Sequence, residues 1–68
     1  MIDFKVEGDH IKMIQLLKVL DLVSSGGEAQ MVVMQGHVKY NGVVDFRKRL
    51  KVRAGDVVEF DGKKIKII

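Results

Sequence analysis

The stretch SSGGEAQMVVMQGHVKYNG, residues 24–42, holds the signals that decide the fold. Ser25 followed three residues later by Glu28 is a capping box, which predicts that a helix begins here. The helix is expected to run to about Gln35, because Gly36 stands where a left-handed residue commonly closes a helix. Its expected buried stripe consists of Ala29, Val32 and Val33, with Met31 and Met34 at the flanks.

After Gly36 the apolar period changes from that of a helix to that of a strand. Val38 to Val44 surround Asn41-Gly42, the strongest short signal for a β-hairpin, because both turn positions require positive φ. Residues Val57 to Ile68 repeat this pattern around Asp61-Gly62. Two hairpins of a small antiparallel sheet are therefore expected in the second half of the chain.

Upstream of this stretch the sequence predicts one strand and a first helix. Ile2 to Val6 alternate in polarity, which is typical of a half-buried strand. Asp9 is a good N-cap for a helix covering Ile11 to Leu22, in which Lys12, Gln15 and Lys18 form a narrow polar stripe. The fold class that follows is α+β, with a two-helix unit packed on a small antiparallel sheet.

Length and composition restrict the class of protein further. The chain has 68 residues, so residues 1–68 are expected to form a single domain with no room for a second core. There is no cysteine, which excludes disulfide scaffolds and thiolate zinc sites and favours the cytoplasm. No apolar run approaches the length of a membrane span, so we expect no membrane partner. A monomer is expected.

The positive charge is concentrated in one segment, residues 47–53, which we call the basic segment. It holds five basic residues and no acid, whereas the rest of the chain has seven basic and nine acidic residues. Such a concentration attracts polyanions, since phosphate contacts release condensed counterions. Leu50 and Val52 alternate with three of the cations, so the apolar pair is expected to be buried and the cations to project from one side. The basic residues are Arg47, Lys48, Arg49, Lys51 and Arg53.

No constellation of catalytic or metal-binding residues is apparent. His10 and His37 are the only histidines, and neither has a second ligand at metal spacing. No nucleophile elbow surrounds the serines, and the acidic residues fall in or beside turns, where Asp bonds local backbone. The sequence therefore predicts no enzyme, no catalytic residue, no metal and no cofactor.

The loop from Ser24 to Gly27 has two interpretations. A helix N-terminus with glycines presents backbone N–H groups to which a phosphate can dock. Glu28 would compete for these same groups if the capping box forms. The sequence alone leaves both interpretations open.

Three pieces of the chain together resemble the S4 RNA-binding domain family, and in particular the small stand-alone S4-like proteins of bacteria, the YaaA/YbcJ group. These pieces are residues 24–30 (SSGGEAQ), residues 36–42 (GHVKYNG) and residues 54–58 (AGDVV). The resemblance covers about Leu16 to Phe60. It implies the S4-like (alpha-L) fold, in which a two-helix unit lies against a small sheet.

The resemblance also implies a function, the binding of structured RNA, commonly ribosomal or transfer RNA. The partner it implies is the ribosome or an assembly intermediate. Carried over to this chain, the RNA-contacting positions are Ser25, Gln30, Lys39, Asn41 and the basic segment, with Lys12 in the family's Arg-Leu-Asp position. The family has arginines where this chain has Gly26 and Gln30, which shifts the expected contact toward the basic segment.

Alternatives remain open at this stage. The basic segment could dock on an acidic protein. Exposure of Met31 and Met34 beside a flat apolar patch would favour such an adaptor, whereas burial of both would disfavour it. The second helix has too few cations to enter a DNA major groove. Asn41 is more readily explained by the turn than by a base contact. The few aromatic residues, Tyr40 and Phe46 among them, are expected mostly in the core rather than stacked on bases.

Overall fold

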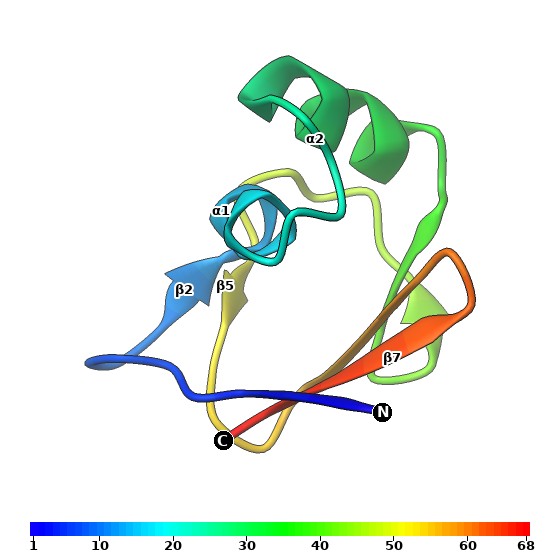
Figure 1. Cartoon of the computed structure of the whole chain (residues 1–68). Coiled ribbons are helices and arrows are strands. Elements are labelled where there is room, and N and C mark those ends of the chain that lie inside the picture. The colour runs from blue at the N-terminus through cyan, green and yellow to red at the C-terminus, as the bar shows by residue number, and fades with distance from the viewer.

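The structure, a computed structural model, describes residues 1–68. Along the chain the elements are β1 (Ile2–Phe4), β2 (Ile11–Lys12), α1 (Met13–Val19), α2 (Gly26–Met34), β3 (Val38–Tyr40), β4 (Val43–Val44), β5 (Lys51–Val52), β6 (Val57–Phe60) and β7 (Lys63–Ile67). Figure 1 shows α1 lying between α2 and the strands. No helix has the length and apolar content that crossing a membrane requires.

The strands form two sheets. Five strands are ordered β1-β7-β6-β3-β4, and β2 pairs with β5 in a separate two-stranded ladder. Every pairing is antiparallel except that of β1 with β7, which is parallel. Both predicted hairpins are present, with positive φ at Asn41 and Gly42 in the first turn and at Asp61 and Gly62 in the second. The predicted α+β class is confirmed.

The predicted start of the first helix is wrong. Asp9 does not cap it: α1 begins at Met13, and Lys12 precedes it in an extended conformation with no side-chain cap. Ile11 and Lys12 instead pair with Val52 and Lys51. This pairing joins residues about 40 positions apart and satisfies their backbone groups, so the sequence pattern within residues 9–22 cannot reveal it.

Both helices end in the same hydrogen-bonded motif. After α1 the chain turns at Asp21, whose φ is 61°, and the N–H of Leu22 donates to Leu17 O at 3.0 Å. After α2 the chain turns at Gly36, and the N–H of His37 donates to Val32 O at 3.0 Å. These are Schellman motifs, in which a left-handed residue satisfies the last carbonyls of a helix. The first helix therefore ends at Val19, earlier than its apolar pattern predicts.

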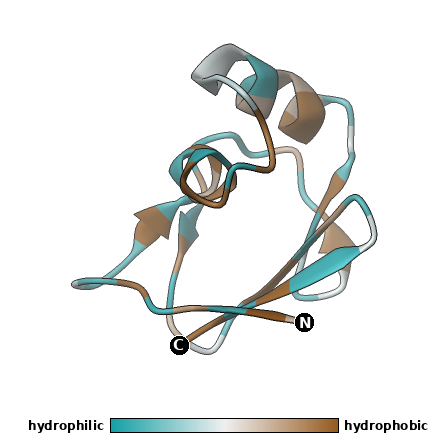
Figure 2. Cartoon of the chain, in the orientation of Figure 1, coloured by the Kyte–Doolittle hydropathy of each residue, from teal (hydrophilic) through white to brown (hydrophobic).

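The core lies between the two helices and one face of the five-stranded sheet. Hydropathy changes along individual strands, β2 among them, as Figure 2 shows, because successive side chains of a strand point to opposite faces. The helices contribute Met13, Leu16, Leu17, Ala29 and Val33, and the strands contribute Val38, Val52, Val58, Ile65 and Ile67; the eleventh buried residue is Val23. The opposite face of the large sheet carries mostly charged residues together with two valines; these residues are Asp3, Lys39, Glu59, Lys64, Lys66, Val44 and Val57.

Candidate nucleic-acid interface

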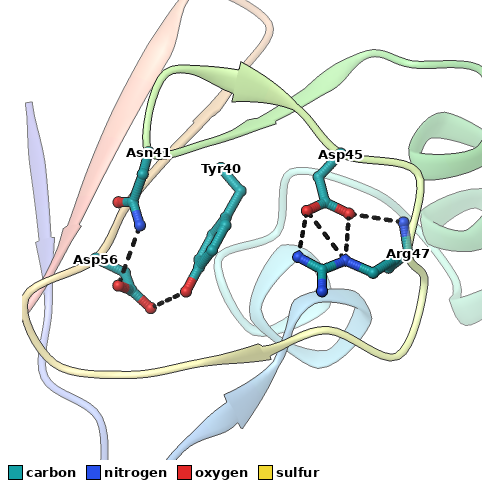
Figure 3. A network of polar contacts seen from close by, with 5 residues as sticks. All are labelled: Tyr40, Asn41, Asp45, Arg47 and Asp56. Atoms are coloured by element: carbon teal, nitrogen blue, oxygen red, sulfur yellow. Dashed lines mark hydrogen bonds and ion pairs between the residues drawn. The ribbon is translucent and has the colours of Figure 1, made fainter.

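A polar network lies where the basic segment ends and the chain leads into β6 (Figure 3). The carboxylate of Asp56 accepts hydrogen bonds from the hydroxyl of Tyr40 at 2.6 Å and from the backbone N–H of Arg53 at 2.8 Å. The Asn41 side chain donates to Asp56 at 3.2 Å, and its oxygen accepts the N–H of Val57 at 2.8 Å. The network ties the β3–β4 turn to the connection between β5 and β6.

The ionisation of this network follows from its contacts. Burial acts to raise the pKa of Asp56, but the hydrogen bonds from Tyr40, Arg53 and Asn41 outweigh it, so the pKa lies below its usual value. The hydrogen bond to Asp56, together with burial, raises the pKa of Tyr40. The carboxylate is therefore ionised and the phenol neutral at neutral pH.

Asp45 and Arg47 form an ion pair at the start of the basic segment (Figure 3). The guanidinium of Arg47 donates to both carboxylate oxygens of Asp45, with Nη2 to Oδ2 at 2.7 Å and Nε to Oδ1 at 3.0 Å. The backbone N–H of Arg47 also donates to Asp45, at 2.9 Å. These hydrogen bonds hold the pKa of Asp45 below its usual value. Arg47 thus forms an ion pair with its neighbour, while its side chain remains 68% exposed.

The basic segment lines an open groove of about 700 Å³. Its apolar lining residues are Met34 from α2, Phe46 from the connection after β4, and Leu50. The cationic lining residues are Arg47, Lys48, Arg49, Lys51 and Arg53, so the groove brings together all five basic residues predicted from the sequence. The predicted alternation is also present, since Val52 is fully buried and Leu50 partly buried, while Arg49, Lys51 and Arg53 are exposed.

A second hollow, of about 390 Å³, adjoins this groove and joins it to the first helix. Lys48 and Arg49 line both hollows. In the second hollow they meet Lys12, which precedes the first helix, Lys18 in the last turn of that helix, and Gly26 at the start of α2. Cations from two regions that are distant in sequence therefore converge.

Some of the exposed cations that line these two hollows form no ion pair. We call this group of side chains the basic surface. Arg47 is paired with Asp45, and Arg53 lies 3.6 Å from a carboxylate oxygen of Asp9. The remaining cations take part in none of the chain's ion pairs. The basic surface thus consists of Lys12, Lys18, Lys48, Arg49 and Lys51.

The other residues predicted for RNA contact lie apart from this surface or are engaged within the fold. Lys39 is exposed next to the fully buried Val38, so it lies on the sheet face opposite the helices. The side chain of Asn41 belongs to the polar network. Gln30 is exposed on α2, in a shallow hollow with Met31 and Met34 that adjoins the groove through Met34.

Ser25 caps α2, as the sequence predicts. Its hydroxyl accepts the N–H of Glu28 at 3.1 Å. The Glu28 carboxylate reaches back to Ser24, whose hydroxyl donates to it at 2.8 Å and whose backbone N–H also donates to it. These bonds lower the pKa of Glu28. An acid already occupies these donors of the loop, which favours capping over phosphate docking.

Sequence reasoning missed two features of the site. It did not place Lys18 at the site, although the polar stripe of the first helix contained that residue. It also expected Phe46 mainly in the core, whereas its side chain is 61% exposed. No His, Asp or Glu side chains gather in groups of three that could hold a metal ion.

Comparison with known proteins gives consistent matches. The model of the S4 domain family matches residues 4–68. The chain is 36% identical over 59 residues to YbcJ of Escherichia coli (strain K12), covering 87% of this chain and 84% of YbcJ. It is 35% identical over 57 residues to the Bacillus subtilis (strain 168) protein named "Probable ribosome maturation protein RlbA", covering 84% of this chain and 80% of that protein.

Solved structures match as well. The solution structure of YbcJ from E. coli, described as revealing an alpha-L motif involved in RNA binding, has a TM-score of 0.75 at 33% identity over 100% of this chain and 87% of that one. The crystal structure of 30S ribosomal protein S4e from Thermoplasma acidophilum has a TM-score of 0.69 at 24% identity over 85% of this chain and 31% of S4e, and shares the fold. The predicted S4-like, alpha-L architecture is confirmed.

Proposed function

The chain belongs to the S4 domain family, and from this we propose that it is a non-catalytic RNA-binding module that holds structured RNA on the basic surface. The observation that carries the proposal is the convergence of unpaired cations. Lys12 and Lys18 from the first helical region meet Lys48 and Arg49 of the basic segment around one hollow. A set of cations held by two packed segments presents a defined pattern of charge.

The mechanism follows from the kind of side chain on the surface. Exposed Lys and Arg contact phosphate oxygens and carry little information about base identity. Structured RNA differs from single-stranded RNA in the positions of its phosphates, so a fixed array of cations selects shape rather than sequence. The proposal does not depend on Lys39, which lies on the other face of the sheet, or on Asn41, whose amide is used within the fold.

The relatives support a ribosomal target. One is named for ribosome maturation, and the fold is shared with a ribosomal protein. We propose ribosomal RNA as the bound RNA, on the ribosome or on an assembly intermediate, and a cytoplasmic location for the monomeric protein. Transfer RNA is the next candidate.

The test is crosslinking and sequencing of RNA recovered with the tagged protein from its own cells. The variant Lys48→Glu with Arg49→Glu reverses charge at the junction of the two hollows. The matched control, Lys64→Glu with Lys66→Glu, makes the same change in charge on the opposite sheet face, since Lys64 and Lys66 flank the buried Ile65. Enrichment of a ribosomal RNA region that only the first variant loses supports the proposal. Equal recovery of RNA by all three proteins overturns it.

One observation favours a second candidate, a protein-interaction adaptor. Met31 and Met34 are 56% and 60% exposed on α2, which meets one part of the condition that favours an adaptor; the hollow that they line also holds Gly27, Gln30 and Gln35. In this case the exposed methionines would contact an acidic partner protein that also binds the basic segment. Recovery of one stoichiometric protein and no RNA, abolished by Met31→Ser with Met34→Ser, would make this candidate the correct one.

A further inference from the structure

The ring of Phe46 is exposed and yet held in place. Its side chain is 61% exposed, although large aromatic side chains are usually buried. One edge of the ring rests against Gly36, the left-handed residue that closes α2: a Cβ at Gly36 would lie 3.0 Å from Phe46 Cε1. The absence of a side chain at Gly36 is what lets the ring approach this closely. The fold thus presents an aromatic ring in a defined position.

The surroundings of the ring combine apolar and cationic side chains. Phe46 lines the 700 Å³ groove together with Met34, which is 60% exposed, and Leu50. The other residues of the groove are the five cations of the basic segment, of which Lys48, Arg49 and Lys51 form no ion pair. A ligand that fits this lining has a flat apolar part and negative charges on either side of it.

A nucleotide of an RNA chain has this chemistry. Its base has a π-face that stacks on aromatic side chains, and a phosphate lies on each side of it in the chain. A base within a continuous duplex is stacked between its neighbours and does not offer that face. A peptide with the same complementarity would need acidic residues flanking an aromatic or apolar one. A nucleic acid strand such as RNA carries a negative charge at every link of the chain.

We infer that the groove takes one unpaired nucleotide of the bound RNA, with its base on the ring of Phe46 and its flanking phosphates on Lys48, Arg49 and Lys51. The inference rests on the proposed function and specifies the kind of RNA that the protein binds. The RNA that this protein binds has a bulge, a loop or a strand end at the basic surface, next to the paired region whose shape the other cations contact.

Two hairpin RNAs test the inference: one with a fully paired stem, and one identical except for a single unpaired adenosine in the middle of the stem. We expect the wild-type protein to bind the bulged hairpin about tenfold more tightly, as the loss of one stacked base typically costs several-fold or more in affinity. In NMR titrations the ring protons of Phe46 are expected to shift with the bulged hairpin and not with the paired one, because a stacked base carries a ring current.

Three variants separate stacking from charge. Phe46→Leu keeps an apolar side chain without an aromatic face and is expected to lower the tenfold preference to less than about twofold, whereas Phe46→Tyr retains it. Val19→Ala, at an exposed apolar residue of α1 outside the groove, is the matched control and is expected to change neither affinity. Lys48→Glu with Arg49→Glu is expected to weaken the binding of both hairpins. Unchanged melting temperatures show that each variant is folded.

The outcomes distinguish this inference from the function on which it rests. Equal affinity of the wild-type protein for the two hairpins, or an undiminished preference in Phe46→Leu, overturns the inference and leaves RNA binding intact. Failure to bind the bulged hairpin, when RNA is still recovered with the wild-type protein from its own cells, overturns the inference alone. Failure of both measurements overturns the inference together with the proposed RNA binding. In that case the exposed Phe46 and Met34 belong to the protein-interaction surface of the second candidate.

Discussion

Arg47 binds Asp45, two residues earlier in the chain, through two guanidinium nitrogens and its backbone N–H. This relationship changes which residues of the basic segment are available to a partner. From the sequence, the five cations of the basic segment are equally available to a partner. In the structure, Arg47 is instead bonded to Asp45 in the loop that carries the other four. Lys48, Arg49 and Lys51 form no ion pair, and the fold places Lys12 and Lys18 beside Lys48 and Arg49.

Charge reversal at Lys48 and Arg49 is expected to lower RNA affinity on the order of tenfold or more, because each reversed cation loses a phosphate contact and adds repulsion. The free energy of unfolding is expected to change by less than about 0.5 kcal/mol, since both side chains are exposed and unpaired. Fluorescence-polarisation titration and thermal unfolding measure the two effects. A loss of stability parallel to the loss of binding would contradict the surface role.

Arg47→Gln is expected to affect the stability of the loop more than the affinity for RNA. It removes the ion pair with Asp45, so amide hydrogen exchange in the loop after β4 is expected to become faster, while RNA affinity falls less than in the Lys48 and Arg49 variant. Native-state hydrogen exchange is the measurement. Arg47→Gln with an exchange pattern identical to the wild type and the larger loss of affinity would show that Arg47 contacts RNA directly.

Salt dependence is expected to report the number of phosphate contacts. If the five cations of the basic surface contact about four or five phosphates, the logarithm of the association constant falls against the logarithm of salt concentration with a slope of roughly −3 to −4. Reversing Lys48 and Arg49 is expected to make the slope shallower by about two, one for each contact. The Lys64 and Lys66 control is expected to keep the original slope. A slope near zero for wild type would rule out the electrostatic mechanism.

Stability is expected to fall at acidic pH because of Asp45 and Asp56. The pKa of each carboxyl is lowered in the folded protein, so the unfolded state binds more protons in the window between the two values. Their contribution is fully present above the unfolded pKa of about 4 and is lost as pH falls through the folded pKa. Chemical unfolding from pH 7 to pH 3 measures this loss. Asp56→Asn is expected to flatten the profile, and a profile identical to wild type would contradict the role of the network.

Gly36→Ala is expected to destabilise the protein by more than about 1 kcal/mol, since a left-handed φ is strained for residues with a Cβ. Gly8 supplies the control: its φ is 76°, but a Cβ there would meet nothing within 4 Å. Gly8→Ala therefore shows the backbone strain alone, and the excess for Gly36→Ala reports the contact with Phe46. Combining Gly36→Ala with Phe46→Leu is expected to remove that excess. Equal destabilisation by the two alanines would show that the ring is not held by Gly36.

Ser25→Ala is expected to lower the free energy of unfolding by about 1 kcal/mol, because it removes the N-cap bond to Glu28. RNA affinity is expected to stay unchanged, since the serine hydroxyl is engaged in the cap. Urea unfolding and an RNA titration of the same variant measure the two quantities. A loss of affinity without a loss of stability would show that Ser25 contacts RNA, as the family resemblance implies.

The sequence by itself determined the elements whose signals are local. The capping box at Ser25, the left-handed Gly36 and the turn at Asn41-Gly42 act through hydrogen bonds and steric limits among residues two to six positions apart, so they can be read from a short stretch. The alternation of the basic segment likewise predicts which of its residues are exposed. From these pieces the α+β class and the likeness to the S4 family follow.

Only the tertiary structure decided what those elements meet. Because Ile11 pairs with Val52, the first helix begins only at Met13. In the packed fold, Lys12 and Lys18 lie beside Lys48 and Arg49. The position of the Phe46 ring likewise involves a contact with a glycine ten residues away. Contacts of this kind form only once the core is packed, because their partners are distant in sequence and no local hydrogen bond specifies them. The composition of the candidate site is therefore a property of the fold.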